Sequence, residues 1–152
     1  MAYTTAEGRE KVLDDLGVAI EHIAQALALL GEAYEQLDEQ TGDVLESRLF
    51  RPVQGAYGRA QRTYSEFAAR SQLPARTFAP HSPGLQSQSV NELIEHAGQS
   101  AEDADQTIAE LQDSMLPVEV GDQELRAGLS QVRELLTPVP SGARDLVRTV
   151  GR

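Results

Sequence analysis

The chain has 152 residues, a net charge of −11 and no cysteine. Its acidic balance makes it a poor ligand for nucleic-acid phosphates, and the lack of cysteine excludes disulfides, thiolate metal ligands and thiol nucleophiles. The N-terminal segment has no apolar signal region, and we find no apolar run of the roughly 20 residues that span a membrane. We therefore expect a cytoplasmic protein that binds neither nucleic acid nor membrane.

Apolar residues at three- and four-residue spacing predict a long amphipathic helix over about residues 5–41. Thr4 followed by Glu7 fits a capping box at its start, and Gly42 is the expected end. The apolar positions of this helix are Leu13, Leu16, Ile20, Ile23, Leu27, Leu30, Tyr34 and Leu37.

A second apolar stripe, with the same spacing, predicts a helix that ends near residue 71 and forms a hairpin, 5–71, with the first. Pro52 is expected to kink this helix or to mark its start. Its aromatic residues are expected to meet the far end of the first helix, near Leu30 and Tyr34. The stripe consists of Phe50, Val53, Tyr57, Ala60, Tyr64 and Phe67.

Residues 72–88 contain three prolines and a glycine, which predicts a linker between two helical halves. Seventeen residues are long for a connection inside one domain. We expect Leu73, Phe78 and Leu85 to anchor the linker on the bundle.

The second half predicts another hairpin, 89–136, which begins with a capping box at Ser89. Three alanines on its inner face predict a close approach to a neighbouring helix. Prolines then separate a short last helix, 141–150, which Ser141 is expected to cap. The sequence thus predicts one all-α domain over residues 1–152, an elongated up-down-up-down four-helix bundle with a short fifth helix. The three alanines are Ala97, Ala101 and Ala104.

Charge alternates along the chain. Counted from the sequence, the net charge is −7 over residues 1–42, +3 over 43–76, −9 over 77–123 and +2 over 124–152. Because short turns make consecutive helices neighbours, we expect each acidic helix to lie beside an arginine-bearing one.

The segment IEHIAQ at 20–25 returns as IEHAGQ at 94–99. A di-iron bundle needs Glu-x-x-His motifs that point inward, whereas adjacent Glu and His residues diverge by about 100° on a helix. We therefore expect both Glu-His pairs to be solvated, with no metal. The offset of 74 residues leaves a duplicated hairpin open as an interpretation.

No residue set predicts catalysis or cofactor binding. His81 lies in the linker and is expected to be exposed. The chain has no nucleophile elbow and no glycine-rich phosphate loop.

Arginines form stripes on the second and last helices. Either they pair with acidic residues of the same chain, or they form a surface for an anionic partner. Both interpretations stay open at this stage. The residues are Arg48, Arg51, Arg59, Arg62, Arg70, Arg144 and Arg148.

Tyr34 and Asp38 have the Tyr-x-x-x-Asp/Glu spacing of small helical-hairpin substrates of type VII secretion, and this short segment is similar to their export signal. The chain lacks the Trp of that family's turn, and Tyr34 lies in the first helix rather than after the second. The resemblance implies an exported helical protein.

The sequence favours a non-enzymatic helical interaction or assembly protein that has no cofactor and forms a homodimer through its first two helices. One alternative is a bundle that binds a small apolar ligand or a metal in its core. The other is a secreted substrate of a type VII-like export system.

Overall fold

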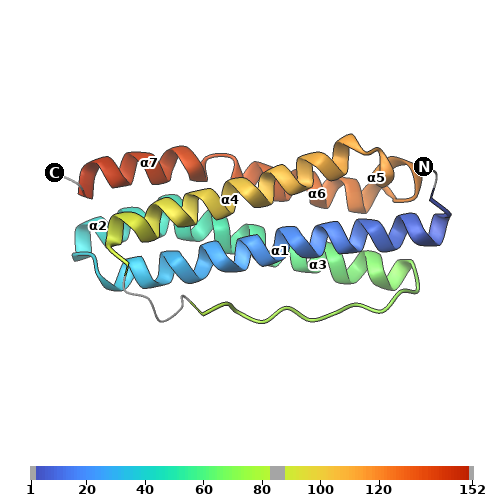
Figure 1. The fold of residues 1–152 in the computed structure, drawn as a ribbon, viewed down its shortest axis with the longest axis horizontal. Helices are drawn as coiled ribbons and strands as arrows, with labels where there is room; N and C mark the ends of the chain where they lie inside the picture. Colours follow the sequence, from blue (N-terminus) through green and yellow to red (C-terminus); the bar gives the residue numbers. More distant parts are fainter. Residues whose placement is uncertain (1–2, 83–87, 151–152) are drawn as a thin grey trace.

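The computed structural model describes residues 3–82 and 88–150 and confirms an elongated all-α bundle (Figure 1). Four columns of helix pack side by side, and α6 and α7 together form the fourth column. The elements are α1 (Thr5–Glu35), α2 (Glu39–Leu45), the π-helical turn η1 (Glu46–Phe50), α3 (Arg51–Arg70), α4 (Val90–Asp113), α5 (Leu116–Glu119), α6 (Gln123–Leu136) and α7 (Val139–Val150).

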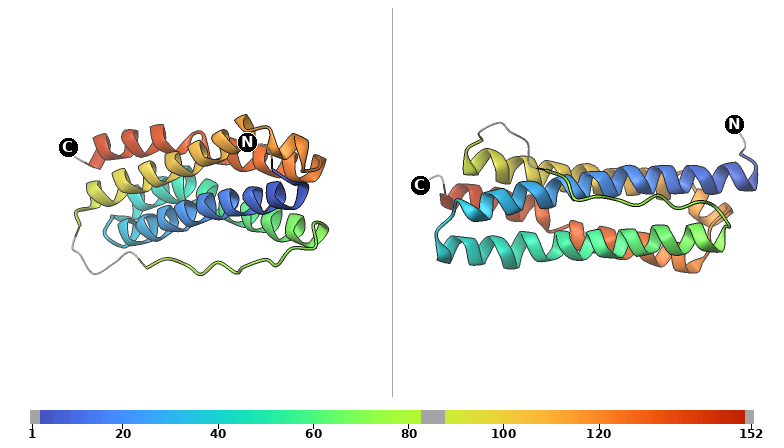
Figure 2. Two further views of the ribbon diagram at one scale, coloured as in Figure 1. Left: turned by 45° about the vertical axis from the view of Figure 1, so that its right-hand side comes forward. Right: turned by 90° about the horizontal axis from the view of Figure 1, so that it is seen from below.

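The columns do not alternate in direction as up-down-up-down. The linker returns along the bundle in the direction of α1, with Arg76 beside Gly17 and His81 bonded to Gln25 farther along. Therefore α4 begins at the end where α3 also begins, and these two helices run parallel (Figures 1 and 2). The return is possible because an extended chain covers about 3.3 Å per residue, more than twice the rise of a helix.

The predicted helix starts are confirmed by their capping contacts. The Thr4 hydroxyl accepts from the Glu7 N–H at 3.1 Å, and the Glu7 carboxylate accepts from the Thr4 N–H at 3.3 Å. Ser89 and Glu92 make the same reciprocal pair at 3.2 Å. These side chains satisfy backbone donors that a helix start leaves without partners.

The predicted end of the first helix is wrong. α1 ends at Glu35, and α2 starts at Glu39 because the Asp38 carboxylate accepts from the Thr41 N–H at 2.8 Å. Gly42 does not end a helix but lies buried inside α2, where an added Cβ would be 3.3 Å from the Tyr34 ring.

Pro52 marks the start of α3, one of the two predicted outcomes, although the chain is already helical through η1 before it. The π-helical turn immediately precedes α3, and Pro52 occupies its first turn. A proline lacks the N–H of the regular ladder and crowds the preceding turn, and the wider π turn accommodates this locally.

The last helix starts at Val139, before the predicted residue 141. Ser141 does not cap it, since its hydroxyl donates to the Pro138 carbonyl at 3.3 Å. Pro138 separates α6 from α7, and the break lets α6 pack mainly on α3 while α7 packs on α4. α7, which the sequence predicts as a short fifth helix, thus completes the fourth column.

The buried side of α1 is broader than the predicted stripe. Leu27 and Leu37 are only partly buried, and Tyr34 is 44% exposed, which corrects their assignment to the inner seam. The reason is that α4 covers one side of α1 while α3 and the linker cover another. Residues outside the stripe are buried as a result, namely Ala19, Ala26, Leu29 and Ala33.

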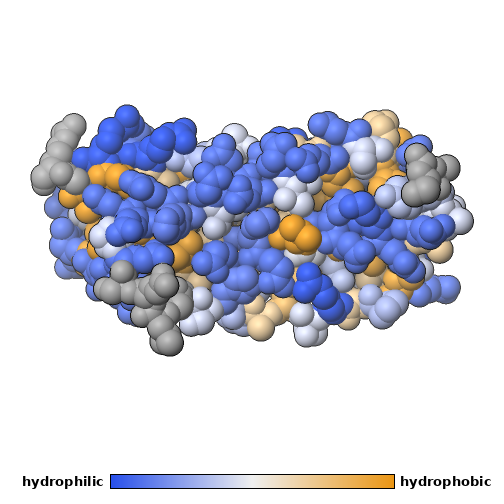
Figure 3. Space-filling view, viewed as in Figure 1, coloured by the Kyte–Doolittle hydropathy of each residue, from blue (hydrophilic) through white to orange (hydrophobic). Residues whose placement is uncertain are grey.

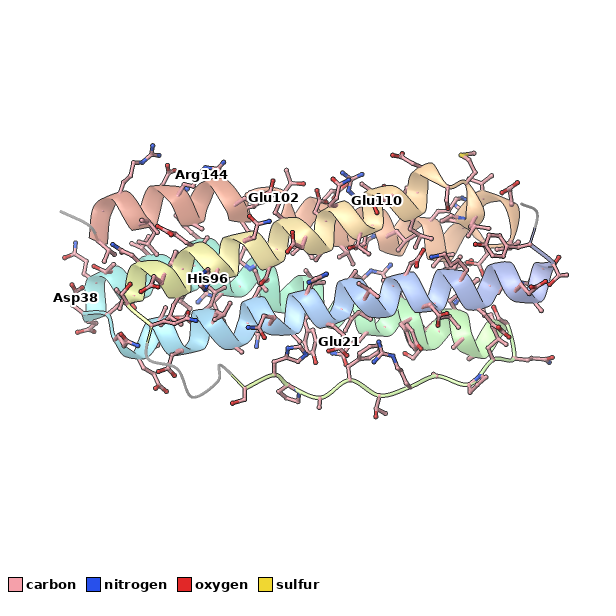
Figure 4. The ribbon with its side chains drawn as sticks, in the orientation of Figure 1. Glu21, Asp38, His96, Glu102, Glu110 and Arg144 are labelled. Carbon is pink, nitrogen blue, oxygen red and sulfur yellow. The ribbon has the colours of Figure 1, made fainter. Side chains whose placement is uncertain are left out.

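Each acidic helix lies beside an arginine-bearing one, as expected, α1 beside α3 and α4 beside α7, but α1 and α4 also pack extensively against each other, which the charge pattern does not predict. As predicted, Ala97, Ala101 and Ala104 are fully buried. Their small side chains allow close contact, and the exposed carboxylates of α4 point outward (Figure 4).

By length and composition, α1 is apolar enough to cross a membrane, which the sequence analysis did not expect. An 18-residue window of it has a mean hydropathy of 1.3, and 56% of that window is buried inside the bundle. The core helix of a bundle meets the same criterion, so this feature carries no further conclusion.

Replacing two glycines by alanine is expected to change the stability of the fold in opposite directions. A Cβ at Gly128 of α6 would lie 2.3 Å from Oγ1 of buried Thr63, whereas one at Gly58 of α3 would meet nothing within 4 Å. We expect Gly128→Ala to destabilise the fold by about 1–3 kcal/mol through overpacking. Gly58→Ala is expected to stabilise it by about 0.5–1 kcal/mol.

Urea unfolding midpoints, compared at unchanged slope, measure both effects. A gain of stability in Gly128→Ala would show that α3 and α6 are not in the described contact.

Candidate functional site

The described part of the linker runs along the bundle over α1 and α3 (Figure 2). We call residues 73–82 the strap. It begins at a Schellman turn, in which Gln72 has φ 58° and the Leu73 N–H donates to the Ala68 carbonyl at 2.9 Å. Leu73 and Phe78 pack against the core, as predicted, whereas Leu85 lies outside the described residues.

Glu21 is the principal polar anchor of the strap. Its carboxylate accepts from Arg76 Nη1 at 3.1 Å and lies 2.5 Å from His81 Nε2. The second ring nitrogen of His81 is 3.1 Å from Gln25 Oε1, so a protonated ring can donate to both oxygens. Hydrogen bonds from His81 first, and from Arg76, lower the pKa of Glu21. Figure 4 shows Glu21 on the side of α1 that faces the linker.

An aromatic contact holds the centre of the strap. The Phe78 ring meets the Tyr64 ring edge to face, with centroids 5.0 Å apart. The Arg76 guanidinium also lies over the Phe78 ring, 4.3 Å from its centroid. Gly17 leaves room for this arginine, since a Cβ there would be 2.7 Å from its Nη2.

Beyond the strap, no described residue of the chain covers the space between α1 and η1. Two adjoining hollows, of about 270 and 280 Å³, share Phe50 as a wall, and Pro80 and His81 of the strap line the second. Burial and the negative charge of Glu21 raise the pKa of Tyr57, which lines the same hollow. We call this surface the α1/η1 groove and define it by Leu27, Gly31, Tyr34, Phe50 and Tyr57.

The walls of the α1/η1 groove come from an acidic part of the chain. Between Lys11 and Arg48 there are nine carboxylates and no lysine or arginine. Glu46 lines the groove directly, and its ion pair with Arg51 is long, 3.9 Å, and exposed. The view of the α1 and α4 face in Figure 3 is mainly hydrophilic, with apolar atoms in separate small areas.

Most of the predicted arginine surface is engaged within the chain. Arg62 and Arg144 are exposed, and within the described residues their guanidinium groups make no hydrogen bond or ion pair. The contacts are mostly at the surface, where each is worth about 0–1 kcal/mol. The role of these arginines toward a partner stays a prediction. The internal pairs are Arg48–Asp145, Arg51–Glu46, Arg59–Gln131, Arg70–Asp122 and Arg148–Asp145.

The two IEH segments do not come together as one site. His22 is half-buried, and exposed His96 bonds to Gln88 at 3.2 Å. Within residues 3–82 and 88–150, no group of three or more His, Asp or Glu side chains is placed to hold a metal ion.

The expectation that Glu21 and His81 are solvated side chains without protein partners is wrong, because the two residues bind each other. The sequence gives no signal for the pair, since 60 residues separate them and the linker has no periodicity.

Tyr34 and Asp38, the residues with the spacing of an export signal, lie on either side of the break between α1 and α2. Tyr34 lines the α1/η1 groove, while Asp38 caps α2. The structure thus gives each of them a local role.

No family model, curated protein or solved structure matches the chain.

Glu21→Gln is expected to loosen the strap, because an amide binds Arg76 and His81 less strongly than a carboxylate does. Trypsin cleavage after exposed Arg76 should become faster at neutral pH. The matched control is Glu32→Gln, a carboxylate of the same helix outside the strap contacts, which should leave the cleavage rate unchanged. Equal rates in the native protein and Glu21→Gln would contradict the anchoring role.

Acid is also expected to release the strap. Since the folded-state pKa of Glu21 is lowered, its ionised form stabilises the strap above the unfolded value of about 4.3. That contribution is lost as the pH falls through the lowered value. NMR signals of the Phe78 and Tyr64 rings, followed from neutral pH to about pH 2, should report the separation. Glu21→Gln should remove this pH dependence, and an unchanged transition in that variant would contradict the assignment to Glu21.

Proposed function

We propose that the chain is a non-enzymatic interaction or assembly protein and that the α1/η1 groove is its association surface. The observation that carries the proposal is an open surface groove lined by Leu27, Tyr34, Phe50 and Tyr57. Aromatic side chains supply much of the energy of protein interfaces because they bury a large area at a small loss of conformational freedom.

Polar groups outside the groove are engaged in contacts between helices of the same chain. Arg70 binds Asp122 through two nitrogens, at 2.6 and 2.9 Å, and Arg133 binds Asp105 at 2.8 Å. These contacts join helices that are distant in sequence. The ionisable groups that the sequence placed on helix surfaces thus contribute to holding the bundle together.

A small apolar ligand is the second candidate, and the same groove favours it over the predicted core site. The hollows are about 270 and 280 Å³, near the lower end of the roughly 300–1,000 Å³ of ligand pockets. Both open to solvent, so a bound small molecule would keep part of its surface exposed. Native mass measurement of the purified chain tests for such a ligand.

Self-association tests the proposed surface. A homodimer through the first two helices would bury the apolar groove but would bring acidic walls together. We therefore expect dimerisation to strengthen as salt rises from about 50 mM to about 0.5 M, because salt screens exposed charges. Light scattering over a hundredfold dilution should show a mass approaching twice 16.5 kDa at high salt.

Tyr34→Ser is expected to weaken this dimer, since Tyr34 is exposed and lines the groove. Val18→Ser is the matched control, because Val18 is 48% exposed on the same helix but does not line the groove. A mass of 16.5 kDa at every salt and protein concentration would refute self-association. Equal effects of the two substitutions would show that dimers form through another face.

A further inference from the structure

We infer that the α1/η1 groove binds an extended segment of a partner protein in which an arginine or lysine stands two residues before an aromatic residue. This inference rests on the proposed function and names the chemistry of the partner. Its evidence is the continuity of the open groove with the section that the strap already occupies.

The strap shows how this surface recognises an extended chain. Arg76 binds the Glu21 carboxylate, and Phe78, two residues later, packs on Tyr64 of α3. The arginine also stacks on the phenyl ring, which orders the two side chains together. A cation on an α1 carboxylate and an aromatic ring on an α3 aromatic residue thus both contribute to holding the strap on these helices.

The open section repeats these features. Tyr57 and Phe50 continue the aromatic side of α3 and η1, at seven-residue steps of about two helical turns each, which place them near one helix face with Tyr64. Pro80 and His81 form the boundary, since they line the hollow that contains both Phe50 and Tyr57. The groove therefore continues directly from the end of the described strap.

The charge of the open section favours a basic partner. Glu46 lines it, and Glu32 and Glu35 lie on the adjoining turns of α1. Glu46 has a long, exposed ion pair with Arg51, at 3.9 Å, while the sequence between Lys11 and Arg48 contains nine carboxylates and no lysine or arginine. Complementary charge accelerates and orients association. The acidic groove of a second copy of this chain does not provide that complementary charge.

The probe is a peptide that copies residues 72–82, QLPARTFAPHS, added to the isotope-labelled full chain and followed by NMR. We expect saturable shifts at Leu27, Gly31, Tyr34 and Phe50. Raising salt should weaken binding several-fold, the opposite of its expected effect on the dimer. Peptides with Arg76→Glu or Phe78→Ala should each bind at least about tenfold more weakly, the loss of roughly one charge-assisted hydrogen bond or one aromatic contact.

Tyr34→Ser in the protein should weaken peptide binding, while Val18→Ser should not. Shifts confined to Gly17, Glu21 and Tyr64 would overturn the inference, because the peptide would then replace the strap instead of filling the open groove. Equal binding of the Arg76→Glu peptide, or no binding of any peptide, would overturn it as well.

The outcome separates the two proposals. If the native chain dimerises in a Tyr34-dependent way but binds no peptide, the proposed function stands and the basic–aromatic partner does not. If Tyr34→Ser changes neither dimerisation nor peptide binding, the groove is not an association surface.

Discussion

The burial of α1 is the constraint on which the rest of the structure depends. Its middle section, from Ile23 to Gly31, has no charged side chain, and apolar residues occur on more than one of its faces. A single partner helix covers only one stripe of such a helix. The chain therefore surrounds α1 with α4 on one side, α3 on another and the strap over the gap between them. The long linker takes part in this arrangement, because its extended strap contacts both α1 and α3.

This constraint also explains why two acidic helices lie together. Fully buried alanines of α4 face α1, and the burial of apolar groups is worth about 0.8 kcal/mol per methylene. Repulsion between exposed carboxylates is weaker because water and salt screen it. Ion pairs such as Arg133–Asp105 then link the acidic α4 to the fourth column. Apolar contact therefore determines which helices are neighbours, and ion pairs at the surface make a smaller contribution.

The sequence predicts local features well and long-range ones poorly. The capping boxes at Thr4 and Ser89 depend on contacts within a single turn, and both form. The break at Asp38 was missed because Tyr34 and Leu37 continue the apolar spacing past the true helix end. Helix direction and the Glu21–His81 contact depend on the path of the linker, which has no periodic pattern to indicate where it lies. For the groove, the sequence predicts only that the first two helices form an interface between two copies of the chain.

The strap and the α1/η1 groove are two sections of one surface, distinguished by whether described residues of the linker cover them. Where the strap lies, Glu21 is bound by the Arg76 guanidinium and by His81, and Phe78 packs on Tyr64. Past Pro80 the aromatic residues continue, and the basic group beside the groove is Arg51, whose ion pair with Glu46 is long and exposed. An apolar contact there leaves the carboxylates solvated and mutually repelling, whereas a contact that also brings a cation removes that repulsion. The strap thus illustrates, within one chain, the combination of charge and aromatic surface that makes binding to this groove favourable.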